Sequence, residues 1–197
     1  MSTDIDKDII SCLSVSLSPK RLEHSCNVAD TAVSLAEKNG VDPLKARLAG
    51  LLHDCAKSMT DTELVNFFKN RKKDFKYFED ISINSPHLLH SYAGEIIAKE
   101  YFKITDKSIL NAVKNHTLGC ENMSILERLI FTSDCISSDR KWERAGFLRE
   151  LAKNDFNKVF FEVLAYKIAY VVRSGSWLCP KTLDTWNWYV SKFKKGI

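Results

Sequence analysis

The chain has 197 residues, of which 45% are hydrophobic and 27% are charged, and its formal net charge is +4. This length suits a single domain with one sizeable core, and the composition excludes disordered and fibrous proteins. With only 7 Gly and 4 Pro, the chain has few tight turns, which favours helices over a many-stranded sandwich.

Start and stop signals predict a succession of helices. Ser18-Pro19 supplies an N-cap and a first helical residue, and Gly40 ends that helix. Asp42-Pro43 repeats the start signal for a helix that we expect to run to about Lys57. Further helices are expected to begin at Thr60 and after Pro180. Four others are expected from about Pro86 to Phe102, from Asp106 to between His116 and Gly119, from Ser124 to Ile136, and from Asp155 to Arg173.

The segments between these helices are expected to be irregular. Residues 70–85 read as a loop or a weak helix, and residues 137–146 read as a loop. No segment is typical of a strand, so the predicted fold class is all-α, a helical bundle.

The cysteines and the chain start indicate the compartment. The six cysteines stand far apart with no C-x-x-C pair, so we expect small buried thiols rather than disulfides or a zinc knuckle. The start, Met1-Ser2-Thr3-Asp4, lacks a signal-peptide stretch, and no run reaches the ~20 apolar residues that span a bilayer. We therefore expect a cytoplasmic protein with no membrane contact.

The basic clusters at residues 71–73 and 192–195 are short, so we expect solvated faces and no nucleic-acid partner.

Imidazole and carboxylate groups recur in the apolar parts of five of the predicted helices. They are His24, His53, Asp54, His90, His116 and Asp134. The adjacent His53-Asp54 pair is weak evidence alone, since a satisfied histidine beside a helix-end carboxylate would look the same. An ionised Asp54 in this apolar stretch is costly to bury unless it is paired or binds a metal. Because facing helices of a bundle bring their side chains together in the core, the whole set predicts a metal site.

The donor atoms also indicate which metal to expect. Mixed imidazole and carboxylate ligands without thiolate favour Fe, Mn, Co or Ni over a structural zinc. On a helix, His53 and Asp54 point about 100° apart, so a shared cation must sit between the two directions. The two oxygens of Asp54 can bridge two ions, so we expect one or two divalent cations.

Several motifs carry a resemblance to a known family. They are Arg21-Leu-Glu-His24, Ala49-Gly-Leu-Leu-His53-Asp54-Cys-Ala-Lys57, Leu88-Leu89-His90-Ser91, His116-Thr117-Leu-Gly119, Ser133-Asp134-Cys-Ile136 with Arg140, and Pro180-Lys-Thr182-Leu-Asp-Thr-Trp186-Asn187. With them the chain resembles the HD superfamily and, within it, the YqeK-like symmetrical bis(5'-nucleosyl)-tetraphosphatases. The resemblance implies one HD-domain helical bundle over residues 1–197. Its core would span about 18–140, and C-terminal helices over 147–194 would complete the nucleotide pocket.

The resemblance also implies an activity and residue roles. The activity is hydrolysis of diadenosine tetraphosphate to two ADP by metal-activated water, with iron as the metal, so the partners are a dinucleoside polyphosphate or a nucleoside diphosphate. The principal metal would be bound by His24, His53, Asp54 and Asp134, and His90 and His116 would hold a second metal or contact phosphate. The catalytic set would be Asp54, Lys57, His90 and His116, and the candidate nucleotide contacts are Arg21, Lys57, His90, His116, Thr117 and Arg140. Ser137-Ser138 stands where the family usually has Glu-Pro, which puts the loop before Arg140 in doubt but not the ligands.

Spacing supports some of these roles and leaves alternatives open. Lys57 lies three residues after Asp54 and could neutralise a departing phosphate, or it could be a solvated helix-end lysine. Arg21 lies one turn before His24, so its guanidinium could face the same cavity. Trp177 could stack on adenine, although aromatic residues near a terminal helix more often pack. His87 reads as a loop residue outside the pattern.

Two rival functions remain at the level of the sequence. Another HD-type phosphohydrolase, such as a nucleotidase or a guanosine tetraphosphate hydrolase, would have the same metal ligands. A catalytically silent nucleotide-sensing module is the second rival, although such a module has no need of the complete ligand set. The sequence is also compatible with a homodimer.

Overall fold

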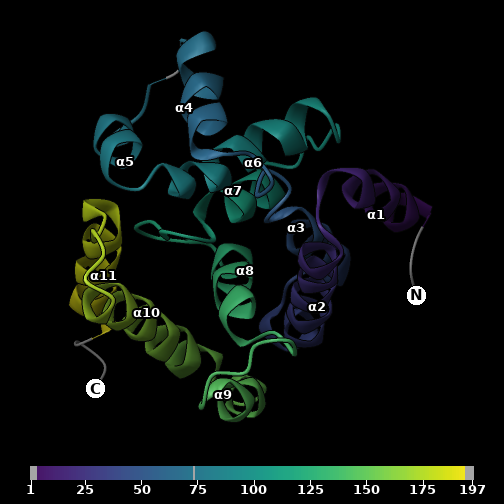
Figure 1. Ribbon diagram of the computed structural model, residues 1–197. Coiled ribbons are helices and arrows are strands. Elements are labelled where there is room, and N and C mark those ends of the chain that lie inside the picture. Colours follow the sequence, from purple (N-terminus) through teal and green to yellow (C-terminus); the bar gives the residue numbers. More distant parts are fainter. Residues whose placement is uncertain (1–3, 73, 194–197) are drawn as a thin grey trace.

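The computed structural model describes residues 4–72 and 74–193, and these residues form helices and connecting segments without a strand (Figure 1). The helices are α1 (Asp4–Ser16), α2 (Pro19–Ala36), η1 (Glu37–Asn39), α3 (Pro43–Leu52), α4 (Asp61–Asn70), α5 (Phe78–Asn84), η2 (Pro86–Leu89), α6 (His90–Glu100), α7 (Lys107–Asn115), α8 (Ile125–Ile136), α9 (Ala145–Ala152), α10 (Phe156–Arg173) and α11 (Pro180–Phe193). The predicted all-α class is confirmed. Residues 1–3, 73 and 194–197, which include parts of the chain start and of both basic clusters, lie outside the described residues.

Local capping explains why most helices begin where the sequence predicts. The Asp42 side chain accepts a hydrogen bond from the Leu44 amide at the start of α3. Both predicted capping boxes form, at Thr60 before α4 and at Ser124 before α8. These signals act within one turn, so they need no tertiary context. Among the described residues, no helix combines the length and the apolar character that crossing a bilayer would require.

The structure corrects the expected end of the helix that begins at Pro43. It ends at Leu52 rather than near Lys57, and residues 53–58 form successive tight turns. Nδ1 of His53 lies 2.7 Å from the Gly50 carbonyl oxygen, which in a continuing helix would accept the amide of Asp54. The next backbone bonds are therefore of the shorter i to i−3 type, as from Lys57 to Asp54.

Helices α1 and α9 were not predicted, and part of the segment 70–85, expected to be a loop or a weak helix, is helical. The helix α1 buries Ile9 and Leu13, and Leu17, directly after it, continues this spacing of one apolar residue every fourth position. The helix α9 occupies residues 145–152, so it begins at the end of the expected loop 137–146. Within the segment 70–85, residues 78–84 form the short helix α5.

The helices that carry the predicted ligands pack directly on one another around α8. The helix α2 packs on α3 and α8, and α7 packs on α3, α6 and α8. The helices α2 and α3 approach each other closely, because a Cβ atom on Gly50 would lie 2.5 Å from the Ala29 Cα. This contact brings the backbones of the two helices together just before His53.

The C-terminal helices cover the side of α8 that faces away from α2 and α3 (Figure 1). The helix α10 packs against α8, α9 and α11. A second cluster of buried residues lies beneath α4 and α5 and includes Leu64, Phe68, Ile81 and Leu89. The segment between α10 and α11 joins this cluster through Cys179 and Trp177, so the C-terminal part closes over the bundle.

Candidate metal centre

Three histidines are fixed in the same way, each at the end of a helical segment. His53 follows α3, His90 follows η2 and His116 follows α7. In each case Nδ1 bonds to the carbonyl oxygen three residues earlier, and these acceptors belong to Gly50, His87 and Val113. Because a carbonyl only accepts, each Nδ1 carries the proton and each Nε2 keeps its lone pair. Three short-range bonds therefore orient three potential metal ligands.

The carboxylate of Asp54 lies among these three nitrogens. Its Oδ1 is 3.2 Å from Nε2 of His90 and 3.5 Å from Nε2 of His116. Its Oδ2 is 3.7 Å from Nε2 of His53. The two oxygens thus face different imidazoles, the arrangement of a carboxylate that can bridge two cations.

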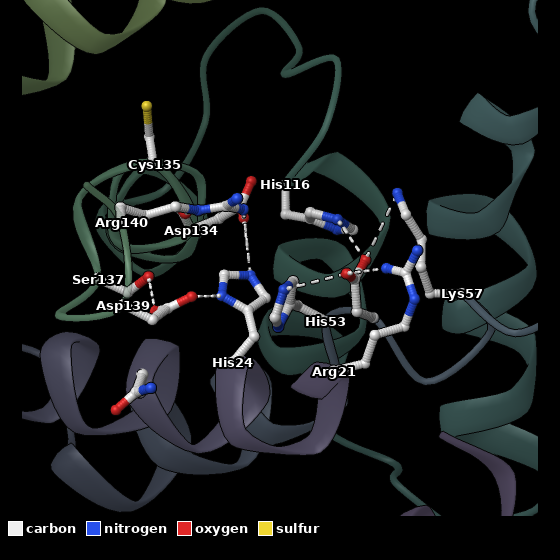
Figure 2. Close-up of polar contacts among 12 residues, drawn as sticks. Arg21, His24, His53, Lys57, His116, Asp134, Cys135, Ser137, Asp139 and Arg140 are labelled. Carbon is white, nitrogen blue, oxygen red and sulfur yellow. Dashed lines mark hydrogen bonds and ion pairs between the residues drawn. The ribbon is translucent and has the colours of Figure 1, made fainter. Parts of the chain in front are cut away.

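Asp134 and His24 complete the cluster from α8 and α2. Nε2 of His24 is 3.2 Å from Oδ1 of Asp134. The imidazoles of His24 and His53 lie edge to face with ring centres 5.3 Å apart, and those of His53 and His116 are 5.0 Å apart. Figure 2 shows these three rings turned toward one another between the ribbons that carry them.

This donor set fits a divalent cation. Nε2 of His53 and Oδ1 of Asp54 are buried and lack a hydrogen-bond partner of good geometry among the described residues. Buried polar atoms without a partner are costly, and a cation would satisfy both. Three ligand atoms of His24, His53 and Asp134 lie within 4.8 Å of one another, as do three of His53, Asp54 and His116. His53 belongs to both groups, so the cluster is one centre rather than two separate sites.

The electrostatics of the cluster favour the protonation states that metal ligands need. Burial lowers the pKa of His53 to about 4 and also lowers the pKa values of His90 and His116. Burial alone would raise the pKa of Asp54, but the imidazoles of His53, His116 and His90 close to its two oxygens outweigh burial and hold that pKa well below its usual range. At neutral pH His53, His90 and His116 are therefore neutral and Asp54 is ionised, as metal binding requires. The pKa of His24 is instead raised, because its contact with Asp134 outweighs the effect of burial.

Cationic side chains line a cavity of about 590 Å³ over one side of the cluster. The guanidinium of Arg21 is 3.8 Å from Oδ2 of Asp54. Nζ of Lys57 is 3.9 Å from Oδ1 of Asp54 and 3.1 Å from Nε2 of His90, and burial lowers its pKa. Lys20 also lines this cavity. The cavity therefore offers positive charge next to the metal ligands.

A second cavity of about 550 Å³ opens on the other side and has an aromatic lining. Its walls include Tyr166, Tyr170 and Trp177 from the C-terminal part. Thr117 and Asp134 line both cavities, so the two meet at the cluster. The hydroxyl of Thr117 lies 2.9 Å from Nε2 of His116, at this junction.

The structure brings the predicted site residues together around the cluster and its two cavities. The six ligand candidates, Arg21, Lys57 and Thr117 converge as described above. The guanidinium of Arg140 lines the cationic cavity and pairs with Asp134, at 2.7 Å from Oδ1 and 2.8 Å from the carbonyl oxygen. Trp177 and His87 line the aromatic cavity and not the cluster itself.

Two residues in contact with the cluster were missed from the sequence. Nζ of Lys167, on α10, lies 3.2 Å from Oδ2 of Asp134 and 3.0 Å from the His116 carbonyl oxygen. The sequence pattern that could have indicated Lys167 is its position one turn after Val163 and Leu164, which places a lysine on the apolar face of the helix. Oδ2 of Asp139 lies 2.8 Å from Nδ1 of His24. The sequence pattern that could have indicated Asp139 is its position directly before Arg140, within the motif that begins at Ser133.

Comparisons with known proteins agree with this geometry. The sequence model of the HD domain matches residues 21–139. A Halalkalibacterium halodurans protein named bis(5'-nucleosyl)-tetraphosphatase, symmetrical, is 32% identical over 87% of this chain and 89% of its own length. A Bacillus subtilis protein of the same name is 28% identical over 94% of this chain and 97% of its own. A solved Clostridium acetobutylicum structure, described as a predicted HD superfamily hydrolase involved in NAD metabolism, matches with TM-score 0.87 and 36% identity over 94% of this chain and 97% of that one. The chain therefore belongs to the HD-domain family, as a relative of the symmetrical bis(5'-nucleosyl)-tetraphosphatases.

Proposed function

We propose that this protein is a metal-dependent hydrolase that cleaves diadenosine tetraphosphate at its midpoint to two ADP. The observation that carries the proposal is the cluster of four histidines and two aspartates at the junction of a cationic and an aromatic cavity. The names of the two full-length relatives support the substrate.

The metal is a divalent cation, which we propose to be iron, with manganese, cobalt or nickel as alternatives. The principal ligands are His24, His53, Asp54 and Asp134, a set of nitrogen and oxygen donors without thiolate. Such a cation, when bound, lowers the pKa of a water molecule and neutralises charge on phosphate oxygens. His90 and His116 hold a second ion through their Nε2 lone pairs, or donate to a phosphate once Nε2 is protonated, since their Nε2 atoms lie 3.2 Å apart and face the same carboxylate.

Positive side chains next to the ligands serve the departing phosphate. Breaking the central P–O bond leaves negative charge on an ADP phosphate, which must be stabilised. Lys57 and Arg21 face Asp54 across the cationic cavity, and neither reaches a hydrogen-bond distance from it. Lys57 also contacts Nε2 of His90, so its remaining donors and those of Arg21 are left for phosphate oxygens. The hydroxyl of Thr117 lies between the two cavities and would contact the same phosphates.

The two cavities suit a substrate with two equivalent halves. One nucleoside would enter the aromatic cavity, where the indole of Trp177 can stack on adenine. The polyphosphate would cross the cluster toward Lys20 and Arg21. In this reading residues 18–140 supply the metal centre, and the helices over 147–194 complete the nucleotide pocket through Tyr166, Lys167 and Trp177. The six free thiols suit the reducing cytoplasm, where we place the protein.

Product analysis of metal-loaded protein tests this function. Protein purified without oxygen and loaded with Fe²⁺ or Mn²⁺ is incubated separately with diadenosine tetraphosphate, guanosine tetraphosphate and mononucleotides, and the products are separated by chromatography. We expect ADP as the single product of the first substrate, and no turnover by the Asp54→Ala variant. Formation of ATP with AMP would contradict midpoint cleavage. Turnover of mononucleotides alone would favour a nucleotidase.

A further inference from the structure

His24 differs from the other three histidines of the cluster in how its ring can be held. His53 and His116 directly follow a helix and His90 stands where η2 meets α6, and each Nδ1 donates to the carbonyl oxygen three residues earlier. His24 lies inside α2 (Pro19–Ala36), where the carbonyl oxygens serve the backbone bonds of the helix. Its Nδ1 instead has its acceptor in another part of the chain.

Asp139 supplies that acceptor. Its Oδ2 lies 2.8 Å from Nδ1 of His24, and its other oxygen, Oδ1, accepts the hydroxyl of Ser137 at 2.7 Å. Both oxygens of the carboxylate are thus engaged, one by the histidine and one by the serine. Figure 2 shows this chain running from Ser137 through Asp139 to His24, on the side of the ring away from Asp134.

The loop that carries Asp139 is itself anchored. Ser137 is fully buried, and its carbonyl oxygen accepts from the Arg149 guanidinium at 2.7 Å and from the Arg140 amide at 2.9 Å. The hydroxyl of Ser138 donates to the side chain of Asn27, one turn after His24 on α2, at 2.9 Å. The carboxylate is therefore held at a fixed place relative to the imidazole, rather than on a free loop.

We propose that Asp139 is a positioning residue for the metal centre, and that Ser137 orients it. Because a carboxylate only accepts, Asp139 requires the proton on Nδ1 of His24 and leaves Nε2, which faces Asp134, to bind the cation. A carboxylate bonded to the far nitrogen also makes an imidazole a stronger ligand. The loop in which this chain has Ser137-Ser138 in place of Glu-Pro therefore supplies a negatively charged partner for His24 from position 139.

Metal affinity tests this assignment without any use of substrate. The dissociation constant of Mn²⁺ is measured by calorimetry on metal-free wild type and on Asp139→Ala, Asp139→Asn, Asp139→Glu and Ser137→Ala. Loss of such a partner weakens metal binding by about 10- to 100-fold, which we expect for Asp139→Ala. We expect a smaller loss for Ser137→Ala and partial recovery in Asp139→Glu, which keeps the charge. Asp184→Ala is the matched control, because Asp184 pairs with Lys76 and Tyr77 far from the cluster.

A second readout separates positioning of the ring from a general effect on folding. In protein loaded with Zn²⁺ and labelled with ¹⁵N, wild type should show a protected Nδ1–H proton of His24 bonded to a carboxylate. Asp139→Ala should lose that signal, and Asp139→Asn, whose amide oxygen still accepts but carries no charge, should shift it. Asp139→Asn keeps the shape of the side chain, so it tests the idea even if Asp139→Ala does not fold. An unchanged Mn²⁺ dissociation constant in Asp139→Asn, or an equal loss in Asp184→Ala, would overturn the assignment. The role of Asp139 in catalysis rests on the proposed function, but its role in metal binding does not. If the wild type showed no turnover but the variants showed the expected Mn²⁺ affinities, the proposed function would fail and the role of Asp139 would stand.

Discussion

Replacing Asp54 by asparagine removes the one side chain whose two oxygens face three different imidazoles. Oδ1 lies 3.2 Å from Nε2 of His90 and 3.5 Å from Nε2 of His116, and Oδ2 lies 3.7 Å from Nε2 of His53. The substitution therefore removes the negative charge that faces all three imidazoles. An amide has the same shape but no charge, and its nitrogen cannot coordinate a cation. We therefore expect Asp54→Asn to lose nearly all of the stabilisation that a divalent cation gives the wild type.

The size of the effect follows from mass action. A cation at 100 times its dissociation constant stabilises a folded protein by about 2.7 kcal/mol. For a chain of this size, each 1 kcal/mol raises the midpoint of thermal unfolding by about 2–4 °C, which gives a shift of about 5–11 °C. Differential scanning fluorimetry with a Mn²⁺ titration measures this shift in wild type, in Asp54→Asn and in Asp30→Asn. Asp30 is an exposed carboxylate on α2 that pairs with Arg47, so its variant should keep the wild-type shift.

Equal shifts in Asp54→Asn and wild type would refute the reasoning, because the cation would then bind without its central carboxylate. A missing shift in all three proteins would likewise contradict a metal centre built from these residues.

Three further predictions concern other parts of the structure. Lys57→Ala should lower kcat for diadenosine tetraphosphate by about 100-fold, because a cation facing the departing phosphate is lost, and an unchanged kcat would show that the lysine serves no such role. Gly50→Ala should lower the free energy of unfolding by about 1–3 kcal/mol in urea titrations, since its Cβ would lie 2.5 Å from the Ala29 Cα, and an unchanged midpoint would disprove the close contact. Burial lowers the pKa of Lys181 to about 8 from an ordinary 10.5, so between these pH values the unfolded chain binds more protons and stability rises with pH. The unfolding free energy of wild type relative to Lys181→Met should therefore increase by about 2 kcal/mol from pH 7 to pH 10, and a difference independent of pH would contradict it.

The parts of the fold that could be predicted are those fixed within one turn of helix. The capping boxes at Thr60 and Ser124 and the start at Asp42 act through bonds between near neighbours, and all three form as expected. The end of α3 could not be placed in the same way. It depends on the His53 side chain taking the carbonyl of Gly50, a bond that competes with an otherwise favourable helical sequence.

The candidate site shows the same division. The ligand candidates could be found because histidine is rare in this chain and stands in apolar segments, where a polar group needs a reason. Lys167 and Asp139 could not be assigned, because their partners lie 33 and 115 residues away in sequence. Lys167 is one of two lysines on α10, and only the packing of α10 on α8 brings it to Asp134. The pairing of Arg140 with Asp134 likewise needed the folded loop.

The most direct test of the central claim is anomalous X-ray scattering from crystals grown with Mn²⁺. The account predicts one or two anomalous peaks within coordination distance of Nε2 of His53 and the carboxylate of Asp54, with His24 and Asp134 among the other ligands. Anomalous peaks confined to other surfaces of the protein, with these four side chains bonded only to one another, would contradict it.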